Sequence, residues 1–538
     1  MTRILTVIVF LRCWFCGCIN KNDMIMKTLS SLKFWQKVAL SFVVFGLALL
    51  SYSIWYIQTR DAREPSKLAF QENCASCHGL DLKGGLRAPS LIDRPLSIID
   101  DYQIIINAMR GGGDVAPSHD WREALSPQML KAIALYVNER QQQYVSTAAS
   151  YSFDPQAGAT VATQHYDIAL SRVTLLQSRP YGLTALPDGR LIVAEKTRGL
   201  SLIERDGQQR APLDGTPRVW DTILSLQGAW LNLGIMLDVA LHPDYVHNGW
   251  VYISHTDRCW LDCLSPVPVT MVQVLRGRIK DNAWVDEQVI WSVHRDHYTP
   301  VPDGVAAGRL AFDKDNHLYI SIGGKNTYGK LHNLDTPFGK IHRVRDDGSV
   351  PSDNPYFVDA DRRAEASTRH TVWSIGHRTG QGLAGHPATG EIWNSEMGPR
   401  GGDEINLIKG GGNYGWPLYT NGLNYNGEYI TIGEDLGLDF PIEETVLPIV
   451  DFTPAPALSN LTFYQGGAFP DWNGDALVGS LKAGTLYRLR IASNAPIQVE
   501  RLLVNFGRVR DVAIGPEGHV YFALEHNENG SIWRLSPR

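Results

Sequence analysis

Cysteine is scarce in this chain, with seven residues among 538. So small a number excludes a disulfide-rich scaffold, and each group of cysteines has to be interpreted separately. A basic excess is also absent, since 50 lysines and arginines face 56 aspartates and glutamates, for a formal net charge of −6. Because binding phosphates requires a basic surface, this balance argues against a nucleic-acid partner.

Several catalytic signatures are missing as well. No G-x-G-x-x-G opens a helix after a strand, and neither a Walker A sequence nor a G-x-S-x-G is present. These absences argue against a dinucleotide-binding domain, a P-loop nucleotidase and an α/β-hydrolase. The chain is instead rich in glycine (50), tyrosine (21) and tryptophan (15), which fits many tight turns between β-strands. At about 150 residues per domain, its length predicts two or three domains.

An uncharged apolar run extends from Val38 to Ile57, and its 20 residues match the length that crosses the hydrocarbon core of a bilayer. Four lysines precede this run, namely Lys21, Lys27, Lys33 and Lys37. The positive-inside rule therefore predicts a cytoplasmic segment 1–37, a single transmembrane anchor 38–57 in the inner membrane, and C-terminal domains on the periplasmic or extracytoplasmic side. A cleaved signal peptide is the alternative, but no A-x-A-like cleavage site follows the run.

A haem-attachment signature follows the predicted anchor. Cys74-Ala75-Ser76-Cys77-His78 is a C-x-x-C-H sequence, in which two thiols bond to the porphyrin and the adjacent histidine binds the iron. Zinc is the chemical alternative, but no second Cys/His pair follows at zinc-site spacing. The segment 70–91, with NCASCHG and GGLRAPSL, resembles the class I cytochromes c. We therefore predict an all-α cytochrome c domain over residues 65–140, ending in a helix at 127–140 with Ser126 as its N-cap.

The sixth ligand of the haem iron departs from that resemblance. The family has a Met-Pro pair before the last helix, whereas this chain has Ala116-Pro117. We favour His119 as the sixth ligand, with Met109 or an open position as alternatives. Met129 belongs to the predicted last helix and is expected to pack in the core.

Residues 141–164 are polar and rich in small side chains, so we interpret them as a linker. Residues 165–538 contain an imperfect repeat, in which a small apolar run leads through a Pro/Asp/Gly turn into an alternating strand. The six occurrences begin at Gly182, Asp238, Gly308, Gly382, Asp471 and Asp511. One four-stranded blade per occurrence predicts an all-β six-bladed propeller, so the whole chain is multidomain.

The same region also carries long, specific motifs. They include EMGPRGGDEINLIK from Glu396, GGGNYGWP from Gly410, LHPDYVHNGWVYIS from Leu241 and SIGHRTGQGLA from Ser374. From Pro180 onward the chain resembles the soluble quinoprotein glucose/aldose sugar dehydrogenases. Those six-bladed propellers use pyrroloquinoline quinone (PQQ) and calcium, so the resemblance implies both cofactors here.

The resemblance also implies site residues. Four cations match those that contact PQQ in the family: Arg378, Lys482, Arg508 and Arg510. The carbonyls of Gly398 and Pro399 match those that hold the calcium of the quinone, and a second calcium site matches Asp403, Glu404 and Tyr414. Oxygen ligands suit this hard cation. Two simpler interpretations remain open, namely that Arg510 pairs with Asp511 and that Arg508 is an exposed surface residue.

The chain departs from the family at the position of the catalytic base. The family's histidine, four residues before the arginine of an H-F-G-G-R-like motif, is Val305 here, which cannot accept a proton. Asp303 and His297 in the adjacent loop are the candidate replacements, although a solvated loop residue is the simpler interpretation of each. Three further family positions also differ, at Leu233, Thr379 and Met397.

Two functions are compatible with these residues. The first is a membrane-anchored quinohaemoprotein oxidoreductase, in which PQQ oxidises a sugar or related alcohol and the haem passes electrons to a respiratory acceptor. The second is a propeller without catalysis, acting as a ligand-binding or interaction module beside an electron-transfer cytochrome; Val305 favours this alternative. Cys259 and Cys263 form a local disulfide if the domain is exported, with free thiols as the alternative.

Overall fold

The structure is a computed structural model that describes residues 64–85, 88–91, 101–112, 120–141, 158, 160–219, 234–259, 264–265, 268–300, 307–324, 327–358, 368–491, 497–504 and 506–538. The predicted anchor, residues 38–57, lies outside these ranges. Within them, no helix combines the length and the apolar character that crossing a membrane requires.

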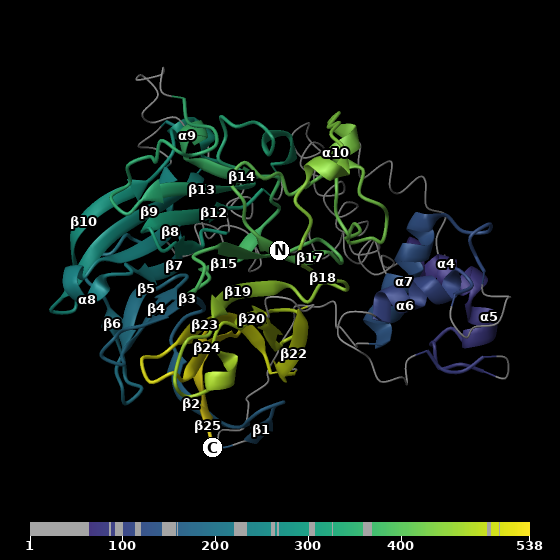
Figure 1. Cartoon of the computed structure of the whole chain (residues 1–538), viewed down its shortest axis with the longest axis horizontal. Helices are drawn as coiled ribbons and strands as arrows, with labels where there is room; N and C mark the ends of the chain where they lie inside the picture. Colours follow the sequence, from purple (N-terminus) through teal and green to yellow (C-terminus); the bar gives the residue numbers. More distant parts are fainter. Residues whose placement is uncertain are drawn as a thin grey trace, which may run out of the picture. The chain divides into compact units, whose positions relative to one another are not determined.

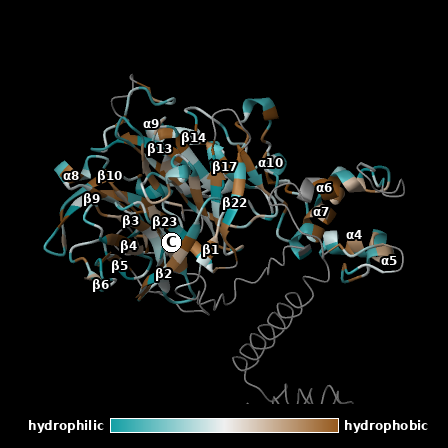
Figure 2. Cartoon of the chain, turned by 60° about the horizontal axis from the view of Figure 1, so that its bottom comes forward, coloured by the Kyte–Doolittle hydropathy of each residue, from teal (hydrophilic) through white to brown (hydrophobic). Residues whose placement is uncertain are grey.

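The haem-attachment region is helical, as predicted. Its described helices are α4 (Pro65–Asn73), α5 (Ala75–His78), α6 (Asp101–Met109) and α7 (Pro127–Gln141). The Met129 amide donates to Ser126 Oγ at 3.2 Å, which confirms Ser126 as the N-cap of α7. Phe70 of α4 packs on Tyr136 of α7 with ring centroids 5.6 Å apart, and hydrophobic stretches (brown) run along α6 and α7 in Figure 2.

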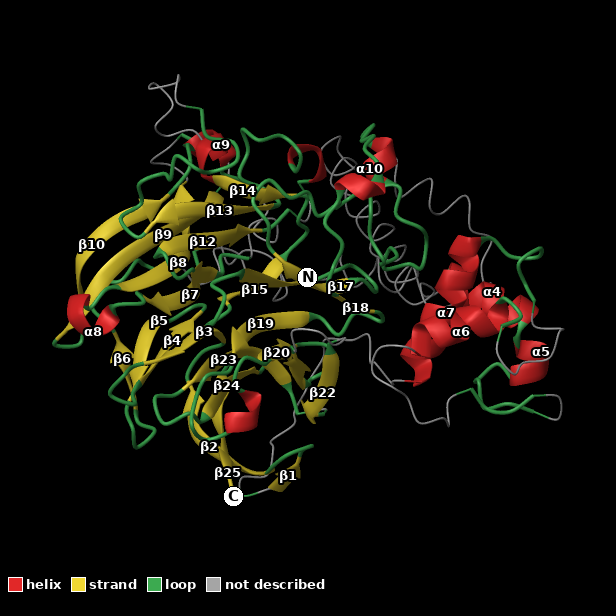
Figure 3. Cartoon of the chain, viewed as in Figure 1, coloured by secondary structure: helices red, strands yellow, loops and turns green. Residues whose placement is uncertain are grey.

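Six antiparallel sheets form the remainder of the described chain (Figures 1 and 3). Their innermost strands contact one another in a closed circle, β3–β7–β11–β15–β19–β23 and back to β3. This circle confirms the predicted six-bladed propeller. The strands of each blade are given from the inside outward. Blades one and two are β3 (Pro180–Ala185), β4 (Leu191–Glu195), β5 (Gly199–Ile203) and β6 (Gln209–Pro212), then β7 (Met236–Leu241), β8 (Val251–Cys259), β9 (Val269–Lys280) and β10 (Ala283–Trp291); blades three and four are β11 (Leu310–Phe312), β12 (His317–Ile322), β13 (Lys340–Arg345) and β14 (Val372–Ile375), then β15 (Gly380–Gly385), β16 (Ile392–Glu396), β17 (Asp403–Leu407) and β18 (Val450–Phe452). Blades five and six are β19 (Leu458–Phe463), β20 (Ala476–Ser480), β21 (Leu486–Arg490) and β22 (Gln498–Leu503), then β23 (Arg508–Ile514), β24 (Val520–Glu525), β25 (Gly530–Pro537) and β2 (Asp167–Leu176).

The sixth blade joins both ends of the propeller sequence. Its outer strand β2 comes before blade one in the chain, yet it pairs along its length with β25 at the C-terminus, and β1 (Thr160–Ala162) adds an edge strand. The ring is therefore closed by backbone hydrogen bonds between the beginning and the end of the propeller. Closure of this kind leaves the circle of sheets without an open seam.

The sequence repeat corresponds to the inner hairpin in five of the six blades, and in blade five it covers β20 and β21. Five occurrences begin on an inner strand or two residues before it, and the occurrence at Asp471 begins in the connection from β19 to β20. The inner strands are buried on both sides by neighbouring blades, which explains the small and apolar residues in the repeat. The short helices between strands are α8 (Tyr245–Asn248), α9 (Thr368–Thr371) and α10 (Ile432–Asp435), with 3₁₀ turns at Arg295–His297, Tyr328–Lys330, Ile442–Glu444 and Pro470–Trp472.

Candidate functional site

The haem-attachment sequence begins at the first turn of α5. The amides of Cys77 and His78 both donate to the carbonyl of Cys74, at 3.2 and 3.0 Å, so this tight turn carries both thiols and the histidine. Burial, together with the neighbouring Cys77, raises the pKa of the Cys74 thiol to about 11. The two attachment residues are therefore close in space, as covalent bonding to one porphyrin requires.

His78 is oriented by a loop that returns to it. Its Nδ1 lies 3.2 Å from the carbonyl oxygen of Pro89, a contact that places the proton on Nδ1 and leaves Nε2 to bind iron. The loop can approach so closely because Gly84 has no side chain, since a Cβ there would lie 2.5 Å from the Ser90 nitrogen at a φ of +82°. This geometry fits the predicted role of His78 as the proximal ligand.

Among the residues considered as sixth ligand, the two methionines lie in or against the hydrophobic core, and the histidine lies outside the described residues. Met109 is 8% exposed and belongs to the hydrophobic core around α7, and Met129 packs against the same core. His119 lies outside the described residues, so its ligation of the iron stays a prediction.

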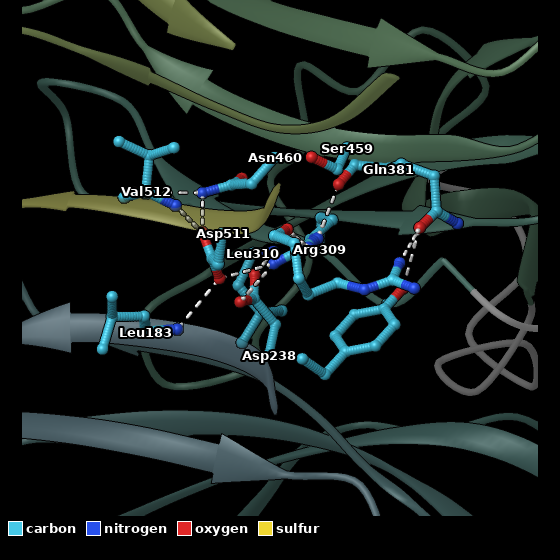
Figure 4. A network of polar contacts seen from close by, with 12 residues as sticks. Leu183, Asp238, Arg309, Leu310, Gln381, Ser459, Asn460, Asp511 and Val512 are labelled. Atoms are coloured by element: carbon cyan, nitrogen blue, oxygen red, sulfur yellow. Dashed lines mark hydrogen bonds and ion pairs between the residues drawn. The ribbon is translucent and has the colours of Figure 1, made fainter. Parts of the chain in front are cut away.

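At the centre of the propeller, the starts of four inner strands meet at one arginine (Figure 4). Arg309 is fully buried, and its Nη1 lies 3.0 Å from Asp238 Oδ1 and 2.9 Å from Asp511 Oδ2. Its Nε donates to the carbonyl of Gln381 at 2.6 Å, and its Nη2 donates to the carbonyl of Arg510 at 3.2 Å. These residues come from β7, β11, β15 and β23 or the residue before the strand, so the strand starts share one end of the ring.

The last residues of the second strands lie at the same end, because antiparallel pairing sets them opposite the starts of the inner strands. Glu195 pairs with Pro180, Glu396 with Gly380, and Glu525 with Arg508. Three of the sequence repeats end in these glutamates, as GRLIVAE, EIWNSE and HVYFALE. This shared ending is a signal in the sequence that could have located these carboxylates, although the motifs alone did not draw attention to them.

Two predicted PQQ-binding cations meet at Glu525. Arg510 Nε donates to Glu525 Oε2 at 2.6 Å, and Arg508 Nη2 lies 4.0 Å from the same oxygen. Asp511 is occupied by Arg309, so the alternative pairing of Arg510 with Asp511 is wrong. The Arg508 side chain is 24% exposed, which also removes the interpretation of a free surface residue.

A lysine that none of the sequence motifs indicated joins this group. Lys196 Nζ lies 3.1 Å from Glu525 Oε1. Burial alone would raise the pKa of Glu525, but Arg510, Lys196 and Arg508 outweigh burial and leave it well below its ordinary value. One ionised carboxylate therefore faces three basic side chains.

Arg378 lies just before β15 and is 5% exposed. Its Nη1 donates to the carbonyls of Met397 and Gly398, both at 2.8 Å, while Nη2 lies 3.2 Å from the Tyr425 hydroxyl. Two buried polar atoms here, Arg378 Nε and Thr379 Oγ1, have no hydrogen-bond partner in the part of the chain that the structure describes. Buried polar groups are rarely left unsatisfied, so these atoms fit a bound polar group such as the predicted PQQ.

The loop with the predicted calcium-binding carbonyls is braced by Asp403. Its Oδ1 accepts from the Gly398 amide and its Oδ2 from the Leu458 amide, both at 2.8 Å. Burial raises the pKa of Asp403 to about 7. A Cβ on Gly398 would lie 2.3 Å from the carbonyls of Gly401 and Gly402, so only glycine fits in this turn. Asp403 thus holds the loop in place through both of its oxygens.

The other predicted calcium residues lie on the neighbouring strands. Glu404 pairs across the sheet with Glu396 and Asp451, and burial together with Glu396 raises its pKa well above the ordinary value. Asn406 Oδ1 nearby is buried without a hydrogen-bond partner among the described residues, while the Tyr414 hydroxyl donates to the Leu407 carbonyl at 2.6 Å. In the described ranges no three acidic, histidine or cysteine side chains converge as a metal site, so a calcium ion here would need backbone and amide oxygens as well.

The remaining predicted residues either lie near the ends of strands or fall outside the described residues. Lys482 follows β20 at the same end of the ring, with its side chain 25% exposed. His297 is half-buried in the 3₁₀ turn after β10. Asp303, Val305 and Leu233 lie outside the described residues. Cys259 is disulfide-bonded, and because Cys263 is outside these residues, the pairing of the two stays a prediction.

The fold and site define a redox protein with a c-type haem region and a propeller that gathers cations at one end. Residues 177–534 match the Glucose / Sorbosone dehydrogenase family, and residues 64–141 match the Cytochrome c family. The chain is 31% identical to aldose sugar dehydrogenase YliI of Escherichia coli over 383 residues, covering 69% of this chain and 94% of the relative. It is 26% identical to quinoprotein glucose dehydrogenase B of Acinetobacter calcoaceticus over 472 residues, covering 74% of this chain and 93% of the relative.

The crystal structure of the soluble aldose sugar dehydrogenase from Escherichia coli in its apo form is also similar, with a TM-score of 0.58 and 28% identity over 69% of this chain and all of that chain. The protein therefore belongs to the glucose/sorbosone dehydrogenase family of sugar-oxidising oxidoreductases and carries a cytochrome c domain. Membership confirms the family resemblance seen in the motifs.

Proposed function

We propose that this chain is a membrane-anchored quinohaemoprotein that oxidises a sugar or related alcohol with PQQ and calcium and passes the electrons to its own covalent haem. The observation that carries the proposal is the set of cations at one end of the propeller, in the same chain as a C-x-x-C-H turn. When bound, PQQ supplies a two-electron oxidant for a hydroxyl-bearing carbon, whereas haem carries one electron at a time.

The side chains divide into binding and bracing roles. Arg378, Arg508, Arg510 and Lys482 would bind the carboxylates of PQQ, because each is cationic and lies at the same end of the ring. Glu525 holds Arg510 in position through the bond from Nε at 2.6 Å. Asp403 fixes the turn whose Gly398 and Pro399 carbonyls would bind calcium. The unsatisfied Asn406 oxygen beside Glu404 supports the second calcium site.

The hydroxyl proton of the substrate also needs an acceptor, since Val305 provides none. Burial and then Lys330 lower the pKa of His297, so this histidine is neutral at pH 7 and able to accept a proton. His297 and Asp303 are the candidate bases of the proposal. The same substitution at Val305 favours the second function, a propeller that binds a ligand without oxidising it.

Fusion of the two domains serves the electron transfer. The segment predicted as a linker, residues 141–164, joins the two domains, although its residues 160–162 form β1 of blade six. A covalent link keeps the haem at a high effective concentration near the propeller, of the order of millimolar for a short flexible chain. The predicted anchor 38–57 would hold both domains on the periplasmic side, near a respiratory acceptor.

The test uses the full chain with haem attached. We expect that PQQ and calcium, added together with a panel of aldoses, reduce the haem, visible as the sharp absorbance band of ferrous c-type haem. The matched control C74A/C77A lacks covalent haem and should still bind PQQ without giving this band. Removal of calcium with a chelator should abolish haem reduction.

The outcomes separate the two functions. Binding of PQQ without haem reduction by any aldose or related alcohol would support the non-catalytic module, and no binding at all would overturn the cofactor assignment. If haem is reduced, H297A and D303A identify the base, since the variant without its proton acceptor should lose turnover by about 100-fold or more.

A further inference from the structure

Lys196 occupies a defined position in the propeller. It directly follows β4, and its amide donates to the Arg179 carbonyl at 2.8 Å. The same bond recurs in blade four, where the Met397 amide donates to the Thr379 carbonyl at 3.0 Å. Met397 directly precedes Gly398 of the predicted calcium loop. Lys196 therefore lies at the end of the ring that carries the predicted cofactor residues.

The surroundings of Lys196 are strongly cationic. On blade six, Glu525 faces it at 3.1 Å, but Glu525 also binds Arg510 and lies 4.0 Å from Arg508. On blade one, Arg179 adds a further positive charge beside Lys196. The ring of Tyr181 packs against Lys196 and Arg510, with Lys196 Nζ 5.6 Å and Arg510 Cζ 5.3 Å from its centroid.

At the buried carboxylate of Glu525, basic side chains outnumber acidic ones. The side chain of Lys196 is only 13% exposed and that of Glu525 is 7% exposed. Lys196 and Arg510 share the carboxylate of Glu525, and charges with few water contacts are stable only when they are paired. An incoming ligand with two or more carboxylates would balance the excess.

The response of Lys196 to protons follows from the same arrangement. Burial, and then the charge of Arg510, lower the pKa of Lys196 to about 7, despite the opposing effect of Glu525. Above that pH the side chain is mainly neutral, because the single carboxylate of Glu525 does not offset burial and the neighbouring cations. An added carboxylate favours the ammonium form and so raises the pKa again.

We propose that Lys196 is a fifth cation of the PQQ site, that it binds a carboxylate of the cofactor, and that it takes up a proton as the cofactor binds. The proposal rests on the function proposed above, since it assumes that PQQ is the ligand. It adds a residue from blade one to a site that the family resemblance built from blades four, five and six.

The sign of the pH dependence is fixed by linkage. Because the bound form holds more protons than the free form, affinity for PQQ falls as the pH rises above about 7. The decrease has an upper limit of about tenfold per pH unit for a single proton. Titration calorimetry in two buffers of different ionisation enthalpy would measure proton uptake directly, without any turnover.

Three variants of the full, haem-loaded chain test the assignment in the presence of calcium. K196M should weaken PQQ binding by about tenfold or more at pH 7 and abolish the proton uptake. K196R keeps a permanent charge, so it should bind PQQ about as tightly as wild type at pH 7. It should show neither proton uptake on binding nor the loss of affinity at high pH. K314M removes the same charge from an exposed lysine in the β11–β12 hairpin and should behave as wild type.

Each outcome has a distinct meaning. If K196M binds PQQ as tightly as wild type and takes up the same number of protons, Lys196 is not part of the site, while the proposed function stands. If K196R still shows proton uptake, another group titrates and the proposal is overturned. Failure of the wild-type chain to bind PQQ would instead remove the proposed function itself. Thermal unfolding of each variant shows that the comparison is made between folded proteins.

Discussion

At the residue scale, the guanidinium of Arg309 connects inner strands of different blades. Asp511 receives hydrogen bonds from Arg309 of blade three and from the Leu183 amide of blade one, the latter at 2.9 Å. Asp238 Oδ2 accepts from the Leu310 amide at 2.9 Å, so Asp238 links blades two and three, whereas Asp511 links blade six to blades one and three (Figure 4). In the sequence, Arg309 is recognised only as the arginine of a family motif. No local pattern indicates that two aspartates distant along the chain contact it.

We expect Arg309→Met to destabilise the protein by about 3–5 kcal/mol, because it leaves Asp238 and Asp511 buried next to each other without a cation. Denaturant unfolding of the full chain measures the difference. The control is Arg190→Met, whose partner Asp188 is 45% exposed, and it should cost no more than about 1 kcal/mol. A loss for Arg309→Met as small as that of the control would show that the network does not hold the blades together.

At the element scale, local sequence accounts for the hairpins and helices, and pairing between elements accounts for the site. Ser126 indicated the start of α7 correctly, and the repeat indicated the inner hairpins. The loop from α5 to Pro89 shows what was not predictable, since the bond from His78 depends on how closely two backbone segments approach. Gly84 permits this approach, but a glycine in a sequence does not reveal which segment it faces.

We therefore expect Gly84→Ala to disturb the haem region. The left-handed backbone at φ +82° costs about 1–2 kcal/mol for a residue with a side chain, and the added methyl collides with the Ser90 amide. Displacement of Pro89 would weaken its bond to His78, make the imidazole a poorer donor to iron and raise the reduction potential.

The matched control is the adjacent Gly85→Ala, where a Cβ would be 3.5 Å from the Cys77 carbonyl, an ordinary contact. Potentiometric titration of the haem and the yield of covalently attached haem are the measurements. Equal potentials in both variants would show that the loop does not tune the proximal histidine.

At the scale of the whole molecule, the proposed location depends on the order of the segments. The predicted anchor precedes the haem region and the propeller, and the propeller is closed by β2 and β25 from its two ends. Since the ring closes on itself, the N-terminal segments can be exchanged without opening the ring. This independence makes the location of the protein testable.

Replacing residues 1–58 by a cleavable signal peptide should give a soluble, exported protein that still carries covalent haem, because the C-x-x-C-H sequence at residues 74–78 lies beyond the replaced segment. A matched chain that keeps residues 38–57 should remain in the membrane pellet after alkaline carbonate extraction. Membrane retention of the version without this segment would contradict the predicted anchor and point to another mode of association.

The haem-attachment turn, the number of blades and the family are predictable from the sequence, because each depends on residues that are adjacent or recur at regular intervals along the chain. The pairing of cations with carboxylates depends on the folded ring: Arg510 binds Glu525 rather than the adjacent Asp511, and Lys196 joins them from another blade. The reason is physical. A buried charge is stabilised by whatever partner lies within a few ångströms, and closure of the ring, rather than the order of residues, brings that partner into reach.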